Sequence, residues 1–148
     1  MSTRPYVRAY MAGIAVPTIF LLVILAGFVV LRLILRIPAP IERIIVFPMA
    51  VVPNVFGLWN MLYIRLRERR HISIGLHGAL LPFVLAPLGG AVACSLGFLT
   101  ATPGGLEYFD AVRVSYELLA AGFCVVIVIY YLGWKYPVNF FNSVVGIA

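Results

Sequence analysis

The stretch Arg65-Leu66-Arg67-Glu68-Arg69-Arg70-His71 separates two long apolar segments, residues 44–64 and 72–100. Each segment is long enough to cross the hydrocarbon core of a bilayer, which takes about 20 helical residues. Together they predict a helical hairpin with a basic turn. Both arms also carry polar or helix-breaking residues that lipid anchoring alone does not require: Pro48, Pro53, Asn54, Asn60, His77, Pro82 and Pro87.

The composition indicates a membrane protein. Apolar residues make up 64% of the 148 residues and charged residues 11%, and the mean hydropathy is +1.08, whereas a soluble domain is about half apolar and a quarter charged. This length allows four crossings and leaves no room for a soluble domain. We predict an all-α, integral membrane four-helix bundle in one transmembrane domain over residues 1–148, with spans near residues 10–31, 44–64, 72–100 and 114–132.

The ends of the outer spans follow from charges and prolines. The first apolar run is too long for a signal-peptide core, and Arg32 and Arg36 close it instead of a cleavage site. Residues 100–105 predict a loop, and residues 106–114 predict an amphipathic first turn or two of the fourth helix. An aromatic belt with Lys135 ends that helix, and Pro137 stops it.

Prolines predict kinks in the second and third spans. Pro48 and Pro53 lie in the first half of the second span, where neighbouring helices must satisfy the freed carbonyl groups. The third stretch would be about 43 Å long as one straight helix, which exceeds the hydrocarbon thickness. We expect it to break at Pro87, Gly89 and Gly90.

Two helix faces are candidates for packing against other helices. At 100° per residue, Asn54, Gly57 and Asn60 share one face, where glycine allows close approach and asparagine needs a partner. The third stretch carries a second face, a stripe of small residues that lets membrane helices approach closely. We name it the small-residue stripe: Gly75, Gly78, Ala79, Pro82, Ala86, Gly89, Ala93 and Gly97.

Basic residues predict the orientation in the membrane. The amino end, the second connection and the carboxyl end carry seven of them, and the first and third connections carry Arg32, Arg36, Arg43 and Arg113. Seven against four favours a cell-membrane protein with both termini in the cytoplasm. The basic turn can also attract anionic lipid headgroups, and no basic patch interleaved with aromatic residues indicates nucleic-acid binding. The seven residues are Arg4, Arg8, Arg65, Arg67, Arg69, Arg70 and Lys135.

His77 is an ionisable residue at membrane depth, which makes it a functional candidate. In the hairpin it lies at a depth similar to that of Asn60, so a hydrogen bond between the two would satisfy both. The alternatives are a haem or chlorophyll ligand and a proton or substrate role. Cys94 and Cys124 each lie in an apolar stretch without a second cysteine nearby in the sequence. We expect both to be buried and to pack as small apolar side chains. Because ligand sets are lacking, we expect no metal and no cofactor.

The sequence contains no nucleophile motif, no zinc-protease motif and no phosphate-binding loop, which argues against an enzyme. We therefore expect a small interaction or structural subunit that binds other membrane subunits or copies of itself within the lipid bilayer. The alternative is a small oligomeric transporter or channel, which would use the break at Pro87, Gly89 and Gly90 together with the carboxylate of Glu117.

Overall fold

The computed structural model describes residues 4–36, 41–108 and 112–147, without the side chains of residues 41–50 and 68–70. The chain separates into two compact units, which we describe one at a time. The first comprises residues 1–72 and 136–148, and the second comprises residues 73–135. Residues 37–40, which connect the first two predicted spans, lie outside the described residues.

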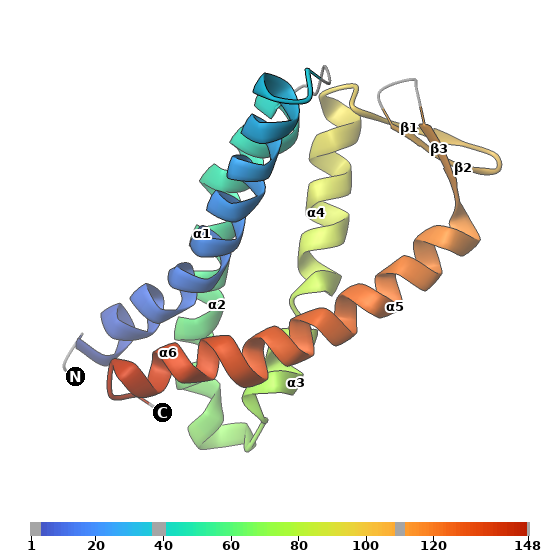
Figure 1. Cartoon of the computed structure of the whole chain (residues 1–148). Helices are drawn as coiled ribbons and strands as arrows, with labels where there is room; N and C mark the ends of the chain where they lie inside the picture. The colour runs from blue at the N-terminus through green and yellow to red at the C-terminus, as the bar shows by residue number, and fades with distance from the viewer. Residues whose placement is uncertain (1–3, 37–40, 109–111, 148) are drawn as a thin grey trace. The chain divides into compact units, whose positions relative to one another are not determined.

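The first unit is built on two long helices that lie side by side, α1 (Arg4–Leu33) and α2 (Ile41–Arg70), together with the short helix α6 (Asn139–Val144) (Figure 1). Ala9, Ile64 and Ile147 form a small apolar core among these three helices. Gly146 ends α6 in the left-handed conformation, with φ +72°. The Ile147 amide then donates to the Asn142 carbonyl at 2.9 Å, which places Ile147 in that core.

The second unit begins with the helices α3 (Ile74–Ala79) and α4 (Pro82–Ser95). The interruption lies at Leu80 and Leu81, not at Pro87, Gly89 and Gly90 as the sequence suggested, because α4 continues through those three residues. Pro82 supplies the physical reason, since it has no amide proton to donate to the Gly78 carbonyl. The Leu81 amide donates to that carbonyl instead, at 3.0 Å, and thereby tightens the turn.

A three-stranded antiparallel sheet follows α4, which corrects the all-α prediction. Its strands are β1 (Leu99–Thr102), β2 (Gly105–Tyr108) and β3 (Val112–Ser115). Thr102 pairs with Gly105 across the tight turn at Pro103 and Gly104, and Glu107 faces both Thr100 and Arg113. Residues 100–105 and 106–114 were predicted as a loop and a helical turn. Their threonine, valine and tyrosine residues favour strands, and a proline-glycine pair favours the hairpin turn.

The helix α5 (Tyr116–Gly133) starts at an N-cap, where the Ser115 hydroxyl accepts from the Leu118 amide at 3.3 Å. Pro137 does not stop this helix, which is a second correction. The chain passes through the π-helix η1 (Trp134–Val138) and continues into α6. A proline inside a regular helix lacks one donor and crowds the preceding turn, and the wider π-turn accommodates both effects.

Within the described residues, three stretches are long and apolar enough to cross a membrane: Arg4–Leu33, Ile74–Ser95 and Tyr116–Val144. Large apolar side chains are exposed along all three, among them Phe20, Leu88 and Leu118. The predicted crossing at residues 44–64 lies within α2 and stays a prediction, as do the four-helix bundle and the kinks at prolines. The molecule is thus mostly helical, with three membrane-length helices and one small sheet.

Candidate functional site: two helix contacts

A pair of asparagines forms the polar centre of the first unit. The Asn60 side-chain amide donates to the Asn142 carbonyl oxygen at 2.7 Å, and the Asn142 amide donates back at 3.2 Å. The Asn60 amide also donates to the backbone carbonyl of Ala9 at 2.8 Å. Both asparagines are almost fully buried. The reciprocal amide pair therefore joins α2 to α6, and the bond to Ala9 joins α2 to α1. Polar contacts of this kind hold helices together in lipid.

Two glycines allow α1 and α2 to come close enough for this contact. A Cβ atom on Gly13 would lie 2.6 Å from the Phe56 carbonyl oxygen, and one on Gly57 would lie 2.5 Å from the Tyr10 ring. The Tyr10 hydroxyl donates to the side chain of Asn54. The face predicted from Asn54, Gly57 and Asn60 therefore packs on α1. We name these contacts the α1–α2 contact.

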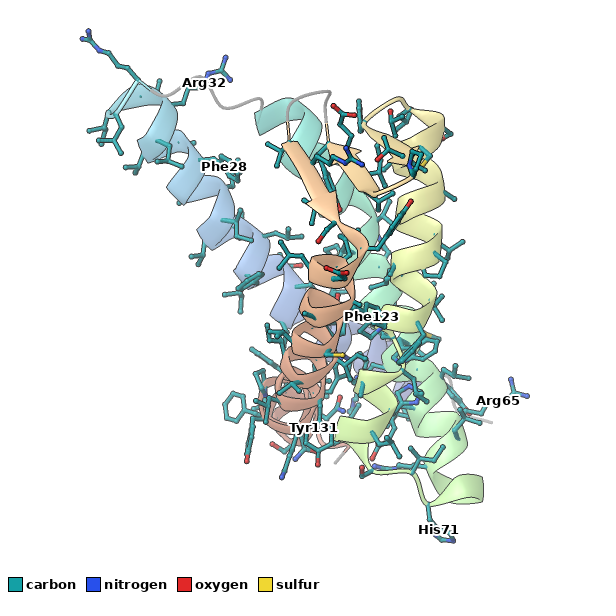
Figure 2. The ribbon with its side chains drawn as sticks, turned by 90° about the vertical axis from the view of Figure 1, so that its right-hand side faces the viewer. Phe28, Arg32, Arg65, His71, Phe123 and Tyr131 are labelled. Carbon is teal, nitrogen blue, oxygen red and sulfur yellow. The ribbon has the colours of Figure 1, made fainter. Side chains whose placement is uncertain are left out.

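Arginines surround the end of the first unit where α2 and α6 finish. Arg67 donates from Nη1 to the Ile147 carbonyl at 2.8 Å. The Nη1 atom of Arg8 lies 3.9 Å from the Cβ position of Gly146. Arg65 is exposed, and Figure 2 shows it with His71 at the lower end of α2. The side chains of Arg69 and Arg70, also predicted for the basic turn, lie outside the described residues.

In the second unit, aromatic rings pack directly against two glycines of α3. A Cβ atom on Gly75 would lie 2.8 Å from the Tyr131 ring, and one on Gly78 would lie 2.0 Å from Cγ of Trp134. His77 packs edge-on against Trp134, with ring centroids 5.7 Å apart. Both rings are buried, His77 with 2% and Trp134 with 0% of its surface exposed. We name this arrangement the Trp134 cradle.

The rest of the small-residue stripe is divided between buried and open positions. Ala79 and Pro82 are buried, while Ala86, Gly89 and Gly97 are exposed and Ala93 is partly exposed. A Cβ atom on Gly89 or Gly90 would meet nothing within 4 Å. The stripe therefore packs on α5 at its α3 end and is open along α4. Both cysteines are exposed, contrary to the prediction that they are buried, because α4 and α5 present these positions away from their contacts.

The predicted hydrogen bond between Asn60 and His77 joins residues of the two units and stays a prediction. The argument for it was that each side chain needed a polar partner in lipid. Asn60 uses both amide protons on Ala9 and Asn142. Among the residues that the structure describes, no group of three or more His, Cys, Asp or Glu could hold a metal ion.

Sequence reasoning missed two residues that organise these contacts, Asn142 and Trp134. Asn142 lies in a mostly apolar tail that also contains Asn139, and an asparagine in such a segment was the signal for a buried partner. Trp134 was assigned to an interfacial belt, which is the usual position of an aromatic residue near the end of a spanning helix. Its alternative role, packing against glycine, cannot be seen without the position of α3.

These features define a helical chain of membrane type in which small residues and amide side chains form the helix contacts. Comparison with protein-family models, with curated proteins and with solved structures found no match.

Proposed function

We propose that the protein is a structural or interaction subunit of a membrane assembly, built from copies of itself or from other membrane subunits. The supporting observation is the open part of the small-residue stripe on α4. Lipid-facing positions of a spanning helix gain nothing from glycine, whereas helix interfaces are enriched in it because it lets backbones approach. Gly89, Gly90 and, on α5, Gly122 would each accept a Cβ without meeting another atom of the chain.

The exposure of α5 supports the same proposal. This 18-residue helix contains no buried residue. Its side chains include Leu118, Val125 and Ile129, all more than half exposed. In a bilayer, lipid tails or another helix would cover this surface. Exposed glycines next to such side chains favour another helix.

We further propose that the chain crosses the cell membrane four times, with both termini in the cytoplasm. The support is the distribution of arginines, since positive residues favour the cytoplasmic side. The α1–α2 contact adds to it, because it ties the start of α1 to the end of α2 and to α6. Reporter fusions at positions 69, 104 and 148 should then read inside, outside and inside. An outside reading at position 69 would overturn this orientation.

Assembly can be tested directly in mild detergent. We expect the extracted protein to run as a complex larger than one chain, with its mass measured by light scattering. Gly89→Leu should leave a folded monomer and remove the larger complex, because leucine fills the open stripe. Gly27→Leu is the matched control, since Gly27 is an open glycine on α1. A Gly89→Leu protein that assembles as well as the control would contradict the proposal.

The transporter alternative stays a proposal. It used a helix broken at Pro87, Gly89 and Gly90, whereas the interruption lies at Leu80 and Leu81 and α4 is continuous at those three residues. Glu117, the acidic residue that it uses, lies in the first turn of α5, two residues after the N-cap Ser115.

A further inference from the structure

We infer that Arg8 and Arg67 form a binding site for the phosphate headgroup of an anionic phospholipid. The site would lie at the end of the first unit where α1 begins and where α2 and α6 end. This inference rests on the proposed placement of these helices in a bilayer, and it goes beyond assembly because it names a lipid as a bound partner.

The guanidinium groups of Arg8 and Arg67 both lie beside the turn that follows α6. Arg8 approaches Gly146, and Arg67 donates to the carbonyl of the next residue, Ile147. Arg8 and Arg67 therefore reach neighbouring residues of the same turn, Gly146 and Ile147. The oxygen atoms of a lipid phosphate accept hydrogen bonds of about 3 Å, so an anionic headgroup beside this turn can pair with either guanidinium group. Guanidinium groups suit the task because they present several donors in a fixed plane.

Among the residues that the structure describes, one N–H group of Arg67 has a hydrogen-bond partner. A guanidinium carries five N–H groups, and the carbonyl of Ile147 accepts from Nη1 alone. This bond also fixes the arginine side chain against α6. Arg8 is exposed and directly precedes Ala9, which is fully buried. The hydrogen bond to Ile147 restrains the Arg67 side chain, which reduces the entropy lost when a ligand binds.

The surrounding charge favours an anion. At this end, the sequence of the first unit carries six arginines and one acidic residue, Glu68. Four of the arginines lie in the last two turns of α2 or directly at its end, where they also offset the negative end of that helix dipole. This surplus of positive charge is larger than is needed to offset the helix dipole. It is complementary to the negative surface potential of a leaflet that contains anionic lipids.

Aromatic residues place this end at headgroup depth. Tyr6 and Tyr10 flank Arg8 on α1, and on α2 Tyr63 lies about one turn before Arg67, with Trp59 about one further turn away. Tyrosine and tryptophan concentrate at the boundary between hydrocarbon and headgroups. An aromatic belt at headgroup depth favours binding of a lipid in a bilayer and contributes nothing to binding of a free phosphate ion. We therefore assign the site to a lipid and not to a soluble anion.

The test measures which lipid the purified protein retains. The detergent-solubilised protein is mixed with phosphatidylglycerol and phosphatidylcholine in equal amounts, and bound lipid is counted by native mass spectrometry. We expect phosphatidylglycerol to be retained preferentially. Each charge is worth about 1 kcal/mol near an anionic surface, so Arg8→Gln should weaken retention roughly fivefold. Arg8→Lys keeps the charge and should retain most of the preference.

Arg36→Gln is the matched control, because it removes one positive charge beyond the other end of α1, four residues after Arg32, which Figure 2 labels. It should leave lipid retention unchanged. Equal retention of the two lipids, or equal loss in Arg8→Gln and Arg36→Gln, would overturn the site. Displacement of the lipid by millimolar inorganic phosphate would assign the site to a soluble anion and overturn the lipid assignment.

The two proposals fail separately. The mass of the Arg8→Gln protein in mild detergent reports assembly, and lipid retention reports the site. Loss of lipid with an unchanged complex supports the site alone. A wild-type monomer that still prefers phosphatidylglycerol removes the assembly proposal and leaves the lipid site standing.

Discussion

Replacing Gly13 by alanine should loosen the α1–α2 contact. The new Cβ atom would stand 2.6 Å from the Phe56 carbonyl oxygen and 2.9 Å from Cα of Gly57. Both are backbone atoms and cannot rotate away, so α1 must move out by roughly 0.7 Å to reach an ordinary contact. The bond from Asn60 to the Ala9 carbonyl, now 2.8 Å, would lengthen to about 3.5 Å, beyond a useful hydrogen bond.

The expected cost follows from three terms. Overpacking costs about 1–3 kcal/mol, and a weakened polar contact between membrane helices costs about 0.6 kcal/mol. Alanine returns about 0.5–1 kcal/mol because it restricts the unfolded backbone more than glycine does. The net effect is a loss of about 0.6–3 kcal/mol in the free energy of unfolding.

Gly27→Ala provides the internal control on the same helix. A Cβ atom there meets nothing within 4 Å, so only the backbone term applies and the protein should gain up to about 1 kcal/mol. The assay is reversible unfolding by sodium dodecyl sulfate in mixed micelles, followed by circular dichroism and analysed only if the transition is two-state. Two substitutions with the same sign and size would refute the close approach of α1 and α2 at Gly13.

Two further predictions concern the other contacts. Gly78→Ala should destabilise the second unit by about 1–3 kcal/mol, because the new Cβ atom would overlap the indole ring of Trp134. It should also shift the fluorescence emission of Trp134. The control Gly89→Ala should change neither the stability nor the emission. In a double-mutant cycle, Asn60→Leu and Asn142→Leu should couple by about 0.6 kcal/mol and at most about 2, and simple additivity would argue against their hydrogen bonds. The same cycle with His77→Leu tests the pair predicted from the sequence.

Hydrophobicity and helical periodicity predicted the long helices and the faces that carry glycine and asparagine. Three membrane-length helices lie where apolar runs were long. Asn54, Gly57 and Asn60 lie on one face, because their spacing fixes their angle on any regular helix. The partner of this face could not be predicted, because periodicity gives the faces of each helix but not which helix packs on which.

The sheet and the continuation of the helix past Pro137 were not predicted, because both depend on contacts with other segments. Residues 99–115 contain both charged residues and apolar ones, which fits an amphipathic turn as well as short strands. Only pairing of β2 with both neighbours selects the strands. At Pro137, local preference says that the helix ends. Burial of Trp134 before it and of Asn142 after it favours a helix that continues.

The π-helix at Trp134–Val138 has a consequence for chain length. A π-turn corresponds to one residue inserted into an α-helix, so deleting one residue there would restore a regular helix and leave later residues on the same face. A deletion of one residue within α5 would instead rotate all later residues of the helix by about 100° about its axis. Homologous chains should therefore differ in length by one residue at this point, and those that are shorter should lack Pro137.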